Sequence, residues 1–195
     1  MKHTKKILIV GAGYVGLAYT SFFAQKYDVT VLDTDNKKIQ NLKNKKPVSD
    51  ELLVNKYLEK YHQNISPITN LECFKSFDLA LMCLPTDYDE DTNYFDTEIL
   101  SNMVECISRK GFGGLLIIKS TVPVGFTNKL SKKLEKKIVF SPEFLREGTT
   151  LPDILKPSRV VAGGCHELCQ EYFDYINSCV EKVSENQFMN TDESE

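Results

Sequence analysis

The glycine-rich segment GAGYVG, residues 11–16, constrains the fold more than any other part of the sequence. It directly follows the apolar run KKILIV and opens a segment with a helical pattern. In this setting Gly11 permits a tight turn, Gly13 lets the backbone approach a diphosphate, and Gly16 allows a helix to pack closely on a strand. The spacing predicts a βαβ unit that binds a dinucleotide at the N-terminus of its helix, with Tyr14 and Val15 in the first turn.

Apolar runs and helical segments alternate along the rest of the chain. Strand-like runs lie at 5–10, 28–33, 77–84, 114–121 and 136–141, and helical patterns lie at 14–26, 36–43, 50–61 and from Gly164 to about Val180. Such alternation is typical of parallel strands joined by helical crossovers, and continuous apolar runs are typical of strands covered on both faces. The sequence therefore predicts an α/β fold, a Rossmann-like, doubly wound, mostly parallel sheet with helices on both faces.

An acidic residue follows the second strand-like run. Asp33 stands twenty positions after Gly13, where a carboxylate can accept both ribose hydroxyls and repel a 2′-phosphate, so it favours NAD over NADP. FAD uses the same fingerprint, and the simpler alternative is that the glycines only make a turn while Asp33 caps the next helix. Lys38 reaches the adenosine end of the cofactor or is simply solvated on its helix.

Composition excludes several other classes of function. The formal net charge is −3 and no basic block interrupts the chain, so nucleic acid is not an expected partner. No apolar run approaches the roughly 18 residues of a membrane helix, and the N-terminus lacks a signal-peptide cleavage site, so we expect a cytoplasmic protein without a membrane span. None of the six cysteines has C-x-x-C spacing, which predicts reduced thiols, several of them in the core, and no metal site.

Polar residues stand where the later strand-like runs end. Thr121 ends the run LLIIKST before Val122-Pro123, Thr86 follows LALMCLP, and ligands of open α/β sheets bind at such strand ends. Both threonines are also ordinary strand-end or capping residues. Glu143 and Glu147 are four apart and would share a face in a helix or turn, where one carboxylate can serve as a base; alone, such a pair is usually a solvated face.

Five stretches, taken together, resemble one family. They are GAGYVGL, LPTDYDEDTNYFDT, KSTVPVGFT, FSPEFLREG and PSRVVAGG, between Ile7 and about Gly164. In this order they resemble the nucleotide-sugar dehydrogenases of the UDP-glucose/GDP-mannose dehydrogenase family, and the loop and turns are similar to its UDP-glucose branch. The resemblance implies oxidation of the C6 hydroxyl of UDP-glucose to the carboxylate of UDP-glucuronate, by two hydride transfers to NAD through a cysteine thiohemiacetal and thioester.

The same resemblance implies roles for individual residues. Thr121 and Glu147 would be catalytic, handling the water that hydrolyses the thioester, and Thr86, Thr121 and Glu147 would also contact the cofactor. The residues that would line the sugar nucleotide are Glu143, Phe144, Leu145, Arg146 and Glu147.

Several family features are missing from the chain. We find no nucleophilic cysteine in a glycine-rich segment before Pro-Lys-Asp; Cys165 follows two glycines but belongs to the RVVAGG position and precedes His-Glu-Leu. We expect an NAD-binding domain at 1–181, a polar tail at 182–195 that begins an interdomain region, and no C-terminal UDP-binding domain. The expected partners are UDP-glucose and either the missing half or a homodimer partner. The chain is then a cofactor-binding half, inactive alone; the alternatives are a non-catalytic NAD-binding module, a dehydrogenase of another nucleotide sugar, or another reductase or lyase of this fold.

Overall fold

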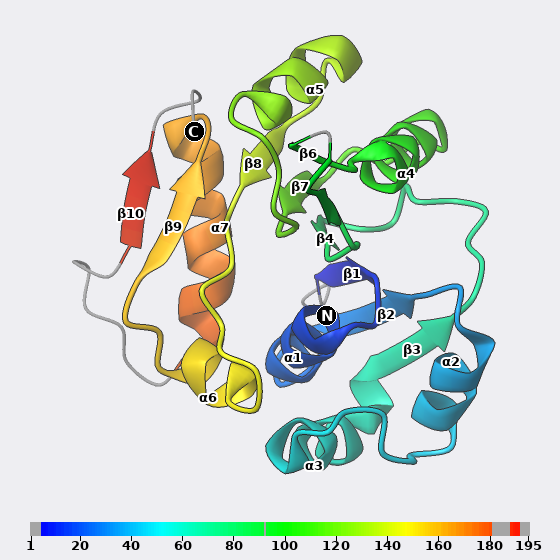
Figure 1. The fold of residues 1–195 in the computed structure, drawn as a ribbon. Helices are drawn as coiled ribbons and strands as arrows, with labels where there is room; N and C mark the ends of the chain where they lie inside the picture. Colours follow the sequence, from blue (N-terminus) through cyan, green and yellow to red (C-terminus); the bar gives the residue numbers. More distant parts are fainter. Residues whose placement is uncertain (1–4, 92, 181–187, 192–195) are drawn as a thin grey trace.

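An eight-stranded sheet forms the centre of the molecule (Figure 1). The computed structural model describes residues 5–91, 93–180 and 188–191. In sheet order the strands are β10 (Phe188–Thr191), β9 (Val160–Gly163), β8 (Ile138–Phe140), β7 (Leu115–Ile118), β4 (Leu79–Met82), β1 (Lys6–Val10), β2 (Asp28–Leu32) and β3 (Ile65–Ile68). Among these strands β8 and β9 are antiparallel and all other neighbours are parallel, so the predicted mostly parallel, doubly wound sheet is confirmed.

The chain reverses its direction of travel across the sheet at β1. That strand pairs with β2 on one side and with β4 on the other, and Val10 lies level with Leu32 and Met82. The carboxyl ends of the three strands therefore meet at one edge. Ligands of open α/β sheets bind at such a switch point, because the crossovers leave a crevice there.

Helices cover both faces of the sheet. They are α1 (Tyr14–Phe23), α2 (Asn36–Lys43), α3 (Leu52–Lys60), α4 (Glu98–Arg109), α5 (Phe126–Leu134), α6 (Thr150–Leu155) and α7 (His166–Cys179), with a 3₁₀ turn at His62–Asn64. Ile7 and Ile9 of β1 belong to a core shared with α1, α3, α6 and α7, whereas Leu8 and Val10 belong to a second core under α4 and α5. Alternate residues of a strand point to opposite faces, so the continuous apolar run of β1 serves both cores.

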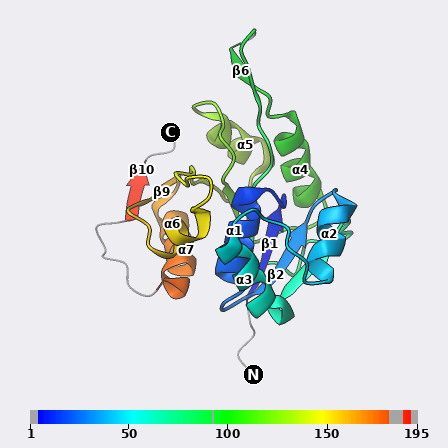
Figure 2. The same ribbon diagram turned by 60° about the horizontal axis from the view of Figure 1, so that its bottom comes forward.

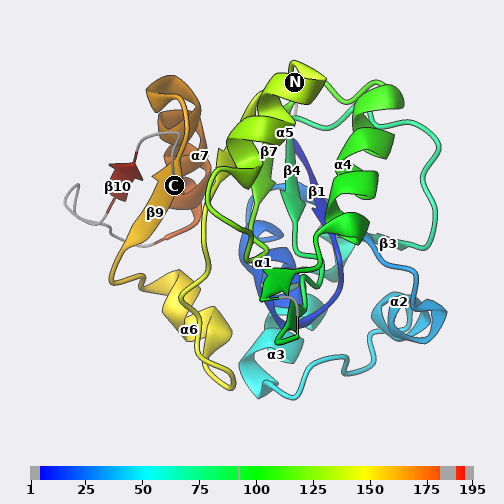
Figure 3. The same cartoon turned by 45° about the horizontal axis from the view of Figure 1, so that its top comes forward.

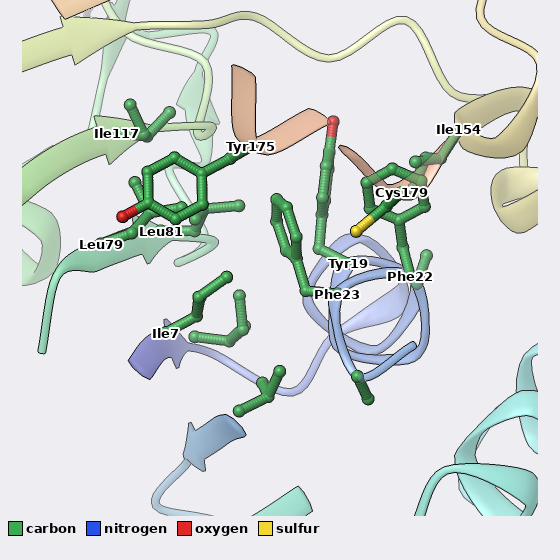
Figure 4. Close-up of a cluster of buried hydrophobic side chains, with 14 of the residues drawn as sticks. Ile7, Tyr19, Phe22, Phe23, Leu79, Leu81, Ile117, Ile154, Tyr175 and Cys179 are labelled. Carbon is green, nitrogen blue, oxygen red and sulfur yellow. The ribbon is translucent and has the colours of Figure 1, made fainter. Parts of the chain in front are cut away.

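Aromatic side chains of α1 fill the first core (Figure 4). The rings of Phe22 and Phe23 meet edge to face with centroids 5.1 Å apart, and both are fully buried. Helix α7 contributes Tyr175 and Cys179 to this core. The burial of Cys179, and of Cys169 on the same helix, agrees with the expectation that several cysteines are small core residues.

Three strands of the sheet lie where no strand was expected: β9, and the two edge strands β3 and β10. The strand β3 contains Pro67, but it is the edge strand beside β2, where a residue without a backbone N–H is tolerated. At the other edge β10 pairs in parallel with β9, beside α7 (Figure 3). Part of the segment expected to be a polar tail thus belongs to the sheet. Helices α4, α5 and α6 were also not among the predicted elements.

The acidic loop at 85–97 contains a small hairpin. Its strands, β5 (Tyr88–Asp89) and β6 (Tyr94–Phe95), are antiparallel, and the rings of Tyr88 and Phe95 lie 5.0 Å apart. The hairpin projects away from the rest of the chain (Figure 2). The loop is part of the stretch LPTDYDEDTNYFDT that carries the family resemblance, and it begins at the strand end that carries Thr86.

A buried carboxylate ties helix α6 to the start of α3. Glu51 accepts hydrogen bonds from the backbone N–H and the hydroxyl of Thr150, at 2.9 and 2.8 Å. Replacing Glu51 by alanine leaves both donors buried and unpaired, and we expect the free energy of unfolding to fall by about 1–3 kcal/mol. Glu72→Ala, which removes an exposed carboxylate 3.5 Å from Lys110, should change it by less than about 0.5 kcal/mol. Denaturant unfolding measures both; equal effects would contradict the assignment.

Candidate dinucleotide-binding site

A cavity of about 810 Å³ lies at the carboxyl ends of β1, β2, β4 and β7. Its lining comes from the turn after each of these strands, as expected at a switch point. It includes eight of the residues predicted to bind the cofactor: Gly11, Gly13, Tyr14, Val15, Asp33, Lys38, Thr86 and Thr121. Gly16 is buried beneath the turn, and Glu147 is exposed outside the cavity.

The glycine turn has space for backbone alone at two positions. Gly11 has a φ of +100°, and a side chain there would collide with the carbonyl oxygen of Cys83. A Cβ at Gly16 would collide with the carbonyl oxygen of Gly11, so the start of α1 packs directly on the turn. At Gly13 nothing lies within 4 Å of a Cβ position, because this glycine faces the cavity. These are the three roles that the spacing predicted.

The N-terminus of α1 is open to an anion. No side chain of the described residues caps the helix at Gly13, and its first turn holds no acidic residue. The first backbone N–H groups of a helix lack partners within the helix, and its dipole favours negative charge there. With Gly13, Tyr14 and Val15 lining the cavity, these amides can bind a diphosphate.

Asp33 is held in place by two backbone amides. One carboxylate oxygen accepts from the N–H of Ala12, and the other accepts from the N–H of Asp35 at 2.7 Å. The cap of α2 is Asp35, which accepts from Lys37 and Lys38 at 2.9 and 3.1 Å, so Asp33 is not the capping residue. Each carboxylate oxygen of Asp33 keeps a lone pair for a ribose hydroxyl. The glycine turn, the open helix N-terminus and this carboxylate together fit a dinucleotide such as NAD.

The ends of β4 and β7 are joined by hydroxyl groups. The hydroxyl of Thr86 donates to the carbonyl oxygen of Thr121 at 2.6 Å, which brings these two predicted site residues together. The buried hydroxyl of Ser120 donates to the carbonyl oxygen of Leu84 at 2.6 Å and accepts from its N–H at 3.1 Å. Ser120 was not predicted as a site residue. The sequence signal that could have identified Ser120 is its position next to Thr121, at the end of a predicted strand.

A second cavity, of about 310 Å³, lies beside the first. It is lined by four of the residues predicted to contact the substrate, Glu143, Phe144, Leu145 and Arg146. The guanidinium of Arg159 lies 4.4 Å from the ring centroid of Phe144, and Arg146 pairs with Asp153 at 2.7 Å. Lys119 and Glu143 line both cavities, so this pair forms the wall between them.

The segment 141–149, which carries Glu143 and Glu147, forms no helix. Only a turn lies at 147–148, and the two carboxylates do not share a face: the side chain of Glu143 is 15% exposed against Lys119, whereas Glu147 is exposed to solvent. The tertiary ion pair, rather than helical periodicity, places Glu143. Glu147 lines neither cavity, and its assignment to catalysis and to cofactor and substrate contact stays a prediction.

Lys119 is a buried cation at the end of β7. Its Nζ lies 3.2 Å from a carboxylate oxygen of Glu143 and donates to the hydroxyl of Ser141 at 3.1 Å. Burial lowers the pKa of Lys119, but the combined effects of Glu143, Tyr172 and Cys83 outweigh it, and the net pKa is raised. Lys119 is therefore charged at neutral pH. Lys119 was not among the residues predicted for the site.

Two cysteines, Cys83 and Cys106, line the dinucleotide cavity, and Cys83 is not suited to act as a nucleophile. Burial raises the pKa of Cys83 to about 12, so its sulfur is a neutral thiol at neutral pH. Among residues 5–91, 93–180 and 188–191 no cluster of three His, Cys, Asp or Glu side chains could hold a metal ion. Over the same ranges, no helix combines the length and the apolar character needed to span a bilayer.

Known proteins resemble the chain over almost all of its length. The UDP-glucose 6-dehydrogenase of Campylobacter jejuni is 42% identical over 200 residues, which cover 97% of this chain and 50% of that protein. The structure of a UDP-glucose dehydrogenase from Pyrobaculum islandicum superposes with a TM-score of 0.84 at 22% identity, over 98% of this chain and 47% of that one. The structure of a UDP-D-ManNAc dehydrogenase from Pyrococcus horikoshii superposes with a TM-score of 0.86 at 20% identity, over 97% of this chain and 47% of that one.

The chain thus spans about half the length of these relatives. The model of the UDP-glucose/GDP-mannose dehydrogenase family, NAD binding domain, matches residues 5–181. This match confirms the resemblance stated from the sequence, and it confirms NAD, rather than NADP or FAD, as the cofactor. The chain belongs to the UDP-glucose/GDP-mannose dehydrogenase family and carries its NAD-binding domain.

Proposed function

We propose that this chain is the cofactor-binding half of an enzyme that oxidises UDP-glucose at C6 to UDP-glucuronate. The observation that carries the proposal is the pair of adjoining cavities, one fitted to a dinucleotide and one lined by Glu143 to Arg146, with a shared wall. NAD, when bound, supplies the hydride acceptor for both oxidations. The proposed enzyme acts in the cytoplasm.

The residues of the chain would have distinct tasks. The open amides of α1 bind the diphosphate, and Asp33 fixes the adenosine ribose. At the far end of the cavity, Thr86 and Thr121 lie where the nicotinamide must meet the sugar. The second cavity would hold the sugar nucleotide, with Phe144 braced by Arg159. Thr121 and Glu147 would handle the water of the hydrolytic step.

We further propose that this chain does not turn over UDP-glucose alone. Oxidation of an aldehyde through a thioester needs a thiolate next to the sugar. Cys83 and Cys106 line the dinucleotide cavity, and Cys83 is held as a neutral thiol by burial, whereas no cysteine of the described residues lines the second cavity, where the sugar nucleotide would lie. The relatives are about twice as long, and a separate C-terminal half or a second copy of the chain would be the partner that completes the site. Two other functions remain as outcomes of the test, a non-catalytic NAD-binding module and a dehydrogenase of another nucleotide sugar, such as the substrate named for the Pyrococcus horikoshii protein.

The test is reconstitution. The purified chain is mixed with NAD and UDP-glucose, with and without the separately expressed C-terminal half of the Campylobacter jejuni relative, and NADH formation is followed. We expect no NADH from the chain alone and steady NADH from the mixture. Steady turnover by the chain alone would refute the claim that it is a half enzyme. If the mixture forms no NADH although calorimetry shows that the chain binds NAD, the result would support the non-catalytic module. If NADH forms with UDP-ManNAc but not with UDP-glucose, the proposed substrate would be wrong and UDP-ManNAc would replace it.

A further inference from the structure

Among the side chains that form ion pairs in the described residues, that of Lys119 is the most deeply buried. Its side chain is 2% exposed, yet it lies in the wall between the two cavities. A lysine is almost never buried unless it is paired, because its desolvation is costly. A position of this kind therefore needs partners that hold the charge in one place.

Those partners come from three separate parts of the chain. Glu143 and Ser141 follow β8 and lie at 3.2 and 3.1 Å from Nζ. The ring centroid of Tyr19, on α1, lies 4.9 Å from Nζ, and that of Tyr172, on α7, lies 5.9 Å away. Aromatic faces within about 6 Å attract a cation, so both rings add to the stabilisation of the Lys119 charge by Glu143 and Ser141.

Glu143 depends on this lysine for its position. The segment 141–149 has no helix or strand that would aim the carboxylate of Glu143. Among the described residues, the backbone amide that donates to this carboxylate is that of the adjacent Phe144, at 3.2 Å. The oxygen of Glu143 nearest Lys119 is buried and makes no aligned hydrogen bond with any described residue, although the ion pair is 3.2 Å long. The other oxygen, Oε1, accepts from the amide of Phe144 and keeps lone pairs with which it can accept a proton from a hydroxyl group or a water molecule.

We propose that Lys119 is a positioning residue, which holds Glu143 ionised and aimed at the boundary between the cofactor cavity and the second cavity. The role in the reaction rests on the proposed function, but the placement of Glu143 does not. Glu143 is the group that faces the reacting atoms, and Lys119 acts through it. A partner cation at this distance keeps a carboxylate charged in a site that would otherwise favour its neutral form.

Hydrogen exchange of the chain as it stands tests the placement. In Lys119→Met we expect the amide hydrogens of the segment 142–147, carried by residues 143–147 because residue 142 is proline, to exchange roughly tenfold faster or more. Those of β1 and α1 should keep their wild-type rates. Lys133→Met removes a cation from an exposed pair with Glu105, 2.6 Å long, and is the matched control; it should leave 142–147 unchanged. Unchanged exchange in 142–147 of Lys119→Met, or an equal rise in all segments, would overturn the proposal.

Two further variants keep the test decisive. Glu143→Gln approaches the pair from the other side and should release the same segment, so it replaces Lys119→Met if that protein does not fold. Lys119→Arg keeps the cation, and we expect it to retain most of the protection at 142–147. Release of the segment in Lys119→Arg to the extent seen in Lys119→Met would mean that the shape of the side chain, and not its charge, places Glu143.

Kinetics of the reconstituted enzyme test the role in the reaction. The titratable groups facing the pair are Tyr19 and Cys83, whose pKa values burial raises, and Tyr172. We expect Lys119→Met to lower kcat roughly 100-fold with less than a threefold change in KM for UDP-glucose, and to move the acidic limb of the pH–rate profile to higher pH. A KM effect alone would contradict the positioning role. A silent wild-type mixture would refute the proposed function and leave the exchange experiment to decide on Lys119.

Discussion

Gly16→Ala is expected to damage both stability and NAD binding. The new Cβ would collide with the carbonyl oxygen of Gly11, and Gly11 cannot yield because it is itself pressed against the carbonyl of Cys83 at a φ of +100°. Backbone on both sides makes this a case of overpacking, for which we expect a loss of about 1–3 kcal/mol in the free energy of unfolding. The turn that presents the amides must also shift, so NAD affinity should fall roughly 100-fold, as for the loss of two hydrogen bonds to a charged group.

Gly13→Ala is the matched control on the same turn. Its φ of −76° suits alanine, and no atom lies within 4 Å of the added Cβ. The free energy of unfolding should therefore change by less than about 1 kcal/mol, and a small gain is possible because alanine restricts the unfolded chain. NAD affinity should still fall, since the methyl group enters the cavity. Thermal unfolding and calorimetric titration with NAD separate the two effects; a Gly16→Ala protein with wild-type stability would contradict the packing argument.

The dinucleotide site was predictable because its parts are local. The turn at 11–16 and Asp33 belong to one βαβ unit, whose geometry follows from a short stretch of chain. The space around each glycine fits the turn, the open backbone and the close packing that the spacing predicted, and the binding of a diphosphate at Gly13 stays a prediction. The strand ends at Thr86 and Thr121 were predictable for a similar reason, since parallel strands bring their carboxyl ends to one edge.

The second cavity was harder to predict because its arrangement is tertiary. The spacing of Glu143 and Glu147 suggests a shared face only if the segment is regular, and it is not. What separates the two carboxylates is Lys119, which reaches Glu143 from the neighbouring strand. In the sequence this lysine only ends an apolar run, and nothing local shows that Tyr19 and Tyr172 enclose it.

The edges of the sheet were missed for a related reason. The run ISPI that forms β3 contains a proline, and FMNT that forms β10 is short and polar. Neither has a sequence pattern typical of a strand. Each is accepted because an edge strand needs only one hydrogen-bonded neighbour, β2 for β3 and β9 for β10.

Asp33→Ala is expected to have the second large effect on NAD binding. The substitution removes the acceptor of the amides of Ala12 and Asp35, and it removes the carboxylate proposed to accept the ribose hydroxyls. Hydrogen bonds to a charged group contribute about 1.5–3 kcal/mol each, so the loss of two to the ribose corresponds to a fall in NAD affinity of roughly 100-fold or more. The repulsion of a 2′-phosphate also disappears, so the preference for NAD over NADP should shrink together with the affinity.

Asp35→Ala provides the comparison, because it removes an equal charge two residues away. Asp35 caps α2 through Lys37 and Lys38 and does not line the cavity. Its loss should lower the free energy of unfolding by about 1 kcal/mol and change NAD affinity by less than about threefold. Calorimetric titrations of both variants with NAD and NADP give the two affinities. Equal losses in Asp33→Ala and Asp35→Ala would mean that the general negative charge of this edge, rather than the oriented carboxylate of Asp33, governs cofactor binding.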